Sequence, residues 1–317
     1  MALFKLSPAF KDYIWGGTKL KSVYKKECDF EKIAESWELS CHKDGESVVA
    51  DSDDKGLTLR QYVEKYGKKV LGTNCERFDD FPILIKLIDA KDNLSVQVHP
   101  DNEYALRVEG GYGKTEMWYI VDCDEGATLL YGFDKEISKE EFEKRIADNT
   151  LLEVTKAVPV KKGDVFFIEA GTLHAIGKGI LIAEIQQNSN TTYRIYDYGR
   201  VGNDGKPREL HTEKALEVTS LRPATVYAET DVEVFEGYTK KLLSSCEYFT
   251  SYVVETKDKA SFETDGKSFH SLLVLEGEGE IQSGNIVKFK KGDSVFVTAD
   301  NGKYTVNGKC RFIRTTV

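Results

Sequence analysis

The feature that most constrains the fold of this chain is a ten-residue repeat. Lys161-Lys-Gly-Asp-Val-Phe-Phe-Ile-Glu-Ala matches Lys290-Lys-Gly-Asp-Ser-Val-Phe-Val-Thr-Ala. In each copy a Lys-Gly-Asp turn comes directly before a strand that reads as buried, and a strand punctuated by glycine precedes the turn. A single copy would be a common hairpin turn. Two copies predict two related β-barrels of the jelly-roll type.

The remaining pattern is also mainly β. From Val154 onward, short runs rich in β-branched and aromatic residues are separated by Gly, Asn and Asp at roughly ten-residue intervals, which is typical of sandwiches and barrels. Two short helices stand out in the first part of the chain. One is amphipathic from Leu59 to about Val70, with Gly72 as its stop.

The second predicted helix has a clear start. Ser138 can cap the helix, Glu141 completes a capping box, and Ile137 can pack on Phe142 as a hydrophobic staple. Asp148-Asn149 limits its length. We therefore expect a few short helices inserted in or around the first of two barrels.

Composition narrows the class of protein. With 317 residues, the chain is long enough for two domains, and 40% hydrophobic with 31% charged residues is typical of a globular protein. The net charge of −9 argues against nucleic acid as a partner. No apolar run is long enough to span a membrane and no secretory leader is recognisable, so we expect a cytoplasmic protein. Six dispersed cysteines without a C-x-x-C pair predict reduced thiols.

Four side chains with lone pairs suggest a metal site. Gln97 and His99 lie in an alternating run, Leu94-Ser-Val-Gln-Val-His-Pro, so both should leave the same face of a strand. Glu116 precedes a second strand-like run and His174 follows a third. Nitrogen and oxygen donors on rigid β elements suit zinc or another borderline divalent ion.

The same residues carry a resemblance to a known family. The stretch from Gly163-Asp164 to Glu169-Ala-Gly-Thr-Leu-His174-Ala resembles the second metal motif of cupins. The chain is also similar to the short bacterial form of the type I mannose-6-phosphate isomerases, over most of its first 215 residues and more loosely after them. The segments that carry this likeness are Tyr13-Ile-Trp-Gly-Gly, Glu35-Ser-Trp-Glu, Gln97-Val-His-Pro-Asp, Lys114-Thr-Glu-Met-Trp and Gln186-Gln-Asn-Ser-Asn-Thr-Thr-Tyr-Arg194.

The resemblance implies a zinc-dependent aldose-ketose isomerase that interconverts mannose 6-phosphate and fructose 6-phosphate. It implies one zinc per chain with Gln97, His99, Glu116 and His174 as ligands, and Arg194 as the active-site arginine. The expected architecture is two cupin-type barrels, with residues 1–225 catalytic and residues 226–317 degenerate. Longer family members have His-Lys-Pro-Glu where this chain has Gly-Lys-Thr-Glu at 113–116, and often Asp at the position of Asn190.

The chemistry needs these residue types. Moving a proton between C1 and C2 of a sugar passes through an enediol whose oxygens become negative, and a divalent ion stabilises that charge without redox chemistry. Lys114, two residues from Glu116, can accept the proton because a neighbouring cation lowers an amine's pKa, or it can contact the phosphate. Arg194 offers a planar donor fork for the phosphate or for a sugar oxygen during ring opening.

Two other functions use similar residues. A cupin dioxygenase would hold iron, usually with three histidines or with two histidines and a carboxylate close in sequence, whereas His99 and Glu116 are widely spaced. A non-catalytic sugar-binding cupin is the other alternative. In the second repeat, Lys303 stands in register with His174, so we expect that barrel to bind no metal. His42, His211 and His270 lack a ligand context.

Overall fold

A computed structural model describes residues 2–202 and 205–317. Within them the chain is mainly β, and the helices are short and lie before residue 219, which confirms the expected fold class. The α-helices are α1 (Lys19–Ser22), α2 (Leu59–Tyr66), α3 (Asn102–Val108), α4 (Lys139–Ala147) and α5 (Thr212–Val218). Single 3-10 turns are η1 (Lys68–Val70), η2 (Thr73–Cys75) and η3 (Leu151–Glu153).

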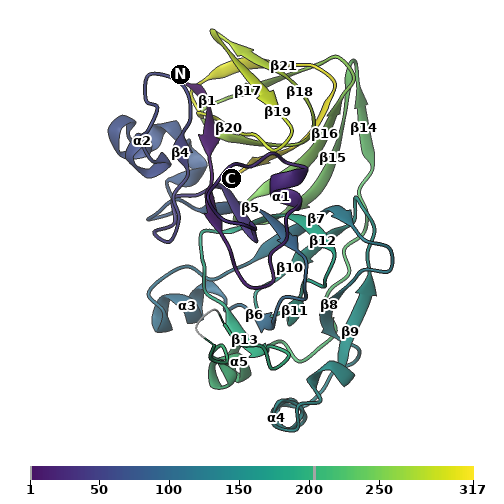
Figure 1. The fold of residues 1–317 in the computed structure, drawn as a ribbon. Coiled ribbons are helices and arrows are strands. Elements are labelled where there is room, and N and C mark those ends of the chain that lie inside the picture. The colour runs from purple at the N-terminus through teal and green to yellow at the C-terminus, as the bar shows by residue number, and fades with distance from the viewer. Residues whose placement is uncertain (1, 203–204) are drawn as a thin grey trace.

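Two facing sheets form the lower half of the molecule in Figure 1, which we call the N-terminal sandwich. The first sheet has the order β10 (Val165–Ile168), β7 (Glu116–Cys123), β12 (Ile180–Gln187), β5 (Ile83–Ala90), β3 (Glu35–Leu39) and β2 (Ala9–Lys11). The second has the order β13 (Tyr193–Tyr196), β6 (Val96–Val98), β11 (His174–Ala175), β8 (Thr128–Phe133) and β9 (Thr155–Pro159). All of these pairings are antiparallel.

A larger sheet, which we call the C-terminal sheet, forms the upper half in Figure 1. Its path runs β14 (Val232–Phe235), β15 (Tyr238–Ser245), β16 (Thr250–Thr256), β22 (Cys310–Thr316), β18 (His270–Ser283), β20 (Ser294–Val297), β1 (Leu3–Ser7) and β4 (Val48–Val49). Strands β17 (Lys259–Thr264), β19 (Asn285–Lys290) and β21 (Gly302–Asn307) branch from it. Strand β1 pairs with β20, so the start of the chain lies in the sheet built by its end.

The two halves share one apolar core. Along β5, β7 and β12 the side chains alternate, and those that point away from the sandwich interior are apolar, such as Ile85, Tyr119 and Ala183. They pack in one cluster with C-terminal residues that include Phe249 and Phe296. The C-terminal sheet therefore covers an apolar face that water would otherwise contact.

The helices test the local predictions. Helix α4 begins where predicted, because the Ser138 hydroxyl accepts from the Glu141 amide and both Ile137 and Phe142 are buried. Only this half of the predicted capping box forms, since the Glu141 carboxylate pairs with Arg145 instead. Helix α2 begins at a complete capping box formed by Thr58 and Gln61. The predicted stop at Gly72 is wrong: α2 ends before Gly67, which has φ +83° and starts a 3-10 turn that continues the same pattern of burial.

Two expectations from composition also bear on the fold. All six cysteines are free thiols. Among the described residues, no helix has the length and apolarity needed to cross a membrane.

Candidate metal centre

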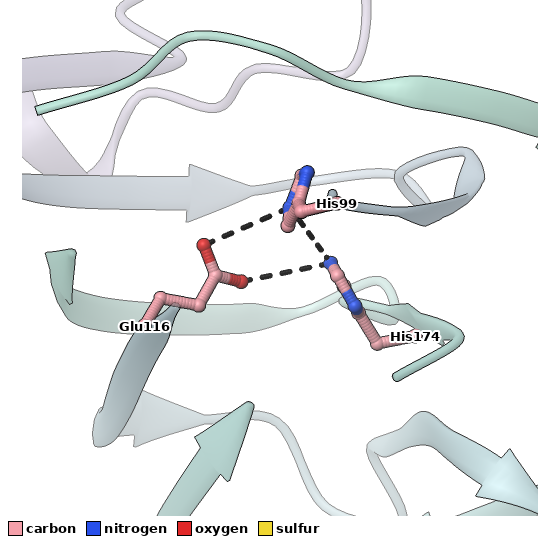
Figure 2. A group of neighbouring side chains, drawn as sticks. All are labelled: His99, Glu116 and His174. Atoms are coloured by element: carbon pink, nitrogen blue, oxygen red, sulfur yellow. Dashed lines mark hydrogen bonds and ion pairs between the residues drawn. The ribbon is translucent and has the colours of Figure 1, made fainter. Parts of the chain in front are cut away.

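Three buried side chains meet between the two sheets of the N-terminal sandwich. Donor atoms of His99, Glu116 and His174 all lie within 4.8 Å of one another, and all three side chains are at most 1% exposed (Figure 2). Glu116 is the first residue of β7 in the six-stranded sheet. His174 is the first residue of β11, and His99 follows β6, in the five-stranded sheet. Both sheets are therefore needed to assemble the group.

The hydrogen bonds of the two imidazoles define which nitrogen carries the lone pair. His99 Nδ1 lies 2.9 Å from the carbonyl oxygen of Thr191, and His174 Nδ1 lies 2.8 Å from that of Thr172. A carbonyl can only accept, so both Nδ1 atoms carry the proton. The unprotonated Nε2 atoms then face each other at 3.1 Å. Two lone pairs so close repel unless a cation lies between them, and a carbonyl on the other nitrogen is the usual support of a metal-binding histidine.

The Glu116 carboxylate completes a set of three donors. Its oxygens lie 3.7 Å from His99 Nε2 and 3.6 Å from His174 Nε2. Ligands of one tetrahedral zinc stand about 3.3–3.6 Å apart, given metal–ligand distances of about 2.0–2.2 Å. Neither oxygen of this buried carboxylate accepts a hydrogen bond of good geometry, and Oε2 has an ion pair with Lys114. The donor set and its spacing therefore fit a divalent ion.

Burial sets the charge of each donor. Burial lowers the pKa of His174 to about 4 and that of His99 well below its ordinary value, so both rings are neutral ligands at neutral pH. Burial, with the nearby Glu184 charge, raises the pKa of Glu116 to about 7. A bound cation would oppose that rise and keep Glu116 ionised.

Gln97 lies beside the histidines as predicted. It pairs directly with His174 across β6 and β11, and its amide nitrogen is 3.3 Å from His174 Nε2. Rotation of the amide by half a turn would direct its oxygen to the same place. On its other side Gln97 pairs with Arg194 of β13. Residues directly opposite in a sheet share a face, so Arg194, Gln97 and His174 form one row that points into the sandwich.

Lys114 reaches the centre from the segment before β7. Its Nζ lies 2.7 Å from Glu116 Oε2, 3.1 Å from His99 Nε2 and 3.7 Å from Glu184 Oε1. The residue is only 4% exposed. The structure thus places this ammonium against two of the predicted ligands.

The interior also holds two charged residues that sequence reasoning missed. Lys86 of β5 lies 3.1 Å from Glu184 of β12 and 3.7 Å from Glu35 of β3, and all three are nearly buried. Trp118 Nε1 donates to Glu184 and Trp37 Nε1 donates to Glu35. The buried charges therefore alternate in sign from Glu35 to Glu116.

A sequence signal for these residues existed. Lys86 interrupts the apolar run Ile83–Ala90 and Glu184 interrupts Ile180–Gln187, and a charge in a fully buried strand requires a partner. Although burial alone would raise it, the ammonium groups of Lys114 and Lys86 lower the pKa of Glu184 to about 2. Glu184 is therefore ionised. Although burial opposes it, the charges of Glu35 and Glu184 raise the pKa of Lys86, which stays charged in the interior.

Arg194 lies in the same row at the edge of this interior. Its Nη1 donates to the Glu209 carbonyl, and its Nε is buried without a hydrogen-bond partner. Burial, and the nearby Arg208, lower the pKa of Arg194. A partly buried guanidinium with a free donor is suited to bind an anion or an alcohol oxygen.

Two glycines explain why the ligand loops fold as they do. Gly171 has φ +87°, and its amide donates to the carbonyl of His99, so this turn ties the two histidine segments together. A Cβ on Gly113 would lie 2.4 Å from the backbone of Asp101, so only glycine lets the segment before Lys114 pass this close to α3.

A cavity of about 550 Å³ lies next to the centre, and none of the predicted ligands lines it. It meets the centre through Thr191, whose carbonyl holds His99. His42 and Asn190 line this cavity, and Asn190 donates to Asp44. His42, His211 and His270 lie outside the described donor group.

Comparison with known proteins identifies relatives over the whole length. Residues 3–122 match the catalytic domain of type I phosphomannose isomerases, and residues 238–317 match the mannose-6-phosphate isomerase cupin domain. The mannose-6-phosphate isomerase ManA of Bacillus subtilis is 40% identical over 95% of this chain and 94% of its own. The mannose-6-phosphate isomerase of Streptococcus mutans is 38% identical over 90% of this chain and 88% of its own.

Solved structures agree. The crystal structure of a Bacillus subtilis mannose 6-phosphate isomerase superposes with a TM-score of 0.94 at 36% identity, covering 100% of both chains. A mutant of the Salmonella typhimurium phosphomannose isomerase superposes with a TM-score of 0.80 at 17% identity over 99% of both chains, which shows a shared fold.

Proposed function

The chain belongs to the type I mannose-6-phosphate isomerases, and we propose that it interconverts mannose 6-phosphate and fructose 6-phosphate through an enediol, with one zinc ion per chain. The observation that carries the metal part is the pair of facing Nε2 lone pairs beside a buried carboxylate without hydrogen bonds. The relatives carry the isomerase activity in their names. The zinc ion and the enediol intermediate are what we propose.

We assign His99, Glu116 and His174 as the zinc ligands, with the amide oxygen of Gln97 as the fourth protein donor. Two imidazoles with one carboxylate suit zinc, which binds nitrogen and oxygen at similar distances. A bound zinc supplies Lewis-acid stabilisation of negative charge on the substrate oxygens. The buried setting strengthens that effect because the local dielectric is low.

Lys114 is our candidate for moving the proton between C1 and C2. Its Nζ lies among the ligands and is almost inaccessible to water, which favours a place at the reacting carbons over one at the distant phosphate. The charge of Glu184, 3.7 Å away, keeps Lys114 next to Glu116, and Lys86 balances Glu184 in turn. Lys86 and Glu184 thus hold the proton-transferring amine in position.

Arg194 is our candidate for a direct substrate contact. It shares the row of Gln97 and His174, and its Nε is buried without a partner. A phosphate or sugar oxygen would satisfy that donor. The planar fork makes lysine a poor replacement.

We further propose that residues 1–225 form the catalytic cupin and residues 226–317 a degenerate cupin without metal. In support, the donors of the described metal group all belong to the N-terminal sandwich. Strand β1 comes from the N-terminal part of the chain but pairs with β20 in the C-terminal sheet.

Metal analysis together with a coupled assay for fructose 6-phosphate formation tests the assignment. We expect close to one zinc per chain, and loss of turnover on chelation that added zinc reverses. Iron with oxygen consumption would instead indicate a dioxygenase. Sugar binding without turnover would indicate a non-catalytic cupin.

A further inference from the structure

Two amide side chains help to hold the segment that carries Lys114 and Glu116, where the Lys114 amide also donates to the Pro100 carbonyl. Strand β7 begins only at Glu116, so residues 113–115 precede its ladder. The Gly113 amide donates to Asn102 Oδ1 at 2.9 Å, and the Thr115 amide donates to Gln187 Oε1 at 2.8 Å. Side chains therefore accept from two of the three backbone amides in residues 113–115.

Gln187 holds the two peptide units that flank the Cα of Thr115. Its side-chain oxygen accepts from the Thr115 amide, and its own backbone amide donates to the Thr115 carbonyl at 3.1 Å. The residue is only 2% exposed. Because Thr115 stands between Lys114 and Glu116, rotation about its backbone bonds would move these two side chains relative to each other.

Asn102 couples this grip to the other half of the molecule. Its Oδ1 accepts from Gln187 Nε2 at 2.9 Å as well as from Gly113, and its Nδ2 donates to the Tyr248 hydroxyl at 3.2 Å. The Asn102 amide group thus has three hydrogen-bond partners: Gly113, Gln187 and Tyr248. A network of this kind has one orientation, since reversing the amide would break the bonds to Gly113 and Gln187.

Tyr248 belongs to the C-terminal sheet and is itself anchored. It lies in the turn between β15 and β16, where the Cys246 amide donates to the carbonyl of Phe249. Phe249 is buried in the core shared by the two halves, and Arg77 donates to the carbonyl of Glu247. Burial and the adjacent Glu247 raise the pKa of Tyr248, so its hydroxyl stays neutral. The turn that carries the Tyr248 hydroxyl is therefore held in place by these contacts.

We propose that Asn102, Gln187 and Tyr248 are positioning residues, and that the C-terminal sheet acts on the active site through the Tyr248 hydroxyl. The proposal rests on the roles given above to Lys114 and Glu116. It gives the metal-free half of the chain a task in catalysis beyond covering an apolar face. Residues that only orient a metal ligand typically contribute 10–100-fold to affinity or activity.

The test compares three variants with the wild-type protein. Gln187→Met keeps the size of the side chain and removes the acceptor, Asn102→Ala removes the hub, and Tyr248→Phe removes only the hydroxyl. For each we would measure kcat, KM, zinc affinity by titration, and amide hydrogen exchange at Gly113 and Thr115. The exchange measurement does not require turnover.

We expect Asn102→Ala and Gln187→Met to lower kcat or zinc affinity by about 10–100-fold. KM should stay within about twofold, because the substrate contacts remain. Exchange at Thr115 should be faster in Gln187→Met, and at Gly113 in Asn102→Ala. Tyr248→Phe should show the same changes in weaker form. Asn102→Asp, which keeps the accepting oxygen, should recover part of the kcat lost in Asn102→Ala.

Asn74→Ala is the matched control, since the Asn74 amide also joins the two halves, by donating to the Val317 carbonyl away from the centre. It should leave kcat and both exchange rates unchanged. Wild-type values in Asn102→Ala and Gln187→Met would overturn the proposal, and so would faster exchange with unchanged kcat and zinc affinity. If wild-type protein neither isomerises the sugar nor binds zinc, the proposed function fails instead.

Discussion

The N-terminal sandwich and the C-terminal sheet use the same local motif for different ends. In the sandwich, the strand after the first Lys-Gly-Asp turn pairs Ile168 with Glu116. In the C-terminal sheet, the strand after the second turn pairs Val297, the equivalent of Ile168, with His270. His270 therefore occupies the position of the carboxylate ligand.

The difference between these two positions lies in their partners. Glu116 faces two imidazole lone pairs and an ammonium, and its oxygens accept no hydrogen bond. His270 Nδ1 is instead 2.7 Å from the Tyr304 hydroxyl, within an apolar cluster. A buried polar group that a neighbour satisfies has little need of an ion, whereas a group left unsatisfied attracts one. The comparison teaches that the neighbours of a side chain, more than its strand, decide whether it can serve as a metal ligand.

The alignment of the repeats needs one structural correction. In the alignment of the two repeats, Lys303 is equivalent to His174. Lys303 is exposed on β21. The inward position belongs to the next residue, Tyr304, which is 2% exposed and contacts His270. The connection before β21 is therefore one residue out of step with the first copy.

The largest effect should come from removing the C-terminal half of the chain. A chain that ends near residue 225 would leave β1 without β20 and would expose the apolar face that Phe249, Phe296 and their neighbours cover. We expect aggregation, measured by size-exclusion chromatography and light scattering. A soluble, monodisperse and active fragment would disprove the covering role.

The next largest effect should come from replacing one histidine in each region. His174→Ala should lower turnover by more than about 100-fold and abolish zinc binding, because it removes a ligand rather than its support. His270→Gln should retain both, since His270 lies outside the group formed by His99, Glu116 and His174. Zinc content and the coupled assay measure this. Full zinc content in His174→Ala would remove the residue from the site.

The charged residues of the centre should separate chemistry from metal binding. Lys114→Ala and Arg194→Ala should keep zinc and lose most turnover, and Arg194→Lys should also be poor because an ammonium lacks the planar fork. Steady-state kinetics and metal analysis on the same preparations would show this. Near-normal kcat and KM in either alanine variant would exclude that residue.

Acid should weaken both regions in the same direction. Burial lowers the pKa of His270 to about 3, from an ordinary 6.5, so the unfolded state takes up a proton that the folded state refuses. The contribution of neutral His270 to the free energy of unfolding is therefore fully present above about pH 6.5, and it falls as the pH drops toward 3. One such proton corresponds to about 1.4 kcal/mol per pH unit.

His270→Gln should reduce that slope by up to this amount, as urea unfolding between pH 7 and pH 4 would show. His174, with a pKa of about 4, has the same sign and in addition releases the metal. It remains in the variant and supplies the residual slope. An unchanged slope in His270→Gln would mean that His270 is protonated in the folded protein.

The smallest effect is expected at Lys303. Its side chain is exposed, so Lys303→Ala should change the free energy of unfolding by no more than about 0.5 kcal/mol and leave turnover intact. Chemical denaturation measures this. A larger loss would show that the second repeat uses this position after all.

Several features of the molecule follow from the sequence alone. Ser138, Glu141 and the flanking Ile137 and Phe142 predict the start of α4, because capping depends on residues within one helical turn. The alternation around Gln97 and the resemblance to the isomerase family predict the ligand set. The donor atoms of His99, Glu116 and His174 converge in the structure, and metal binding by them stays a prediction. The predicted end of α2 was wrong because two glycines lie within six positions and both have positive φ, Gly67 at +83° and Gly72 at +92°, so the first of them already ends the helix.

Tertiary structure alone decided the rest. The pairing of Lys86 with Glu184, the return of β1 to the far end of the chain, and the contact of Tyr248 with Asn102 each join residues widely separated in sequence. Such contacts depend on strand order and on how the two sheets face each other, and no local pattern of residues encodes either. The sequence by itself indicated which groups have the chemistry to bind a metal, and it left open which residues hold the phosphate. Only the folded chain decided which buried charges surround them and what keeps them in place.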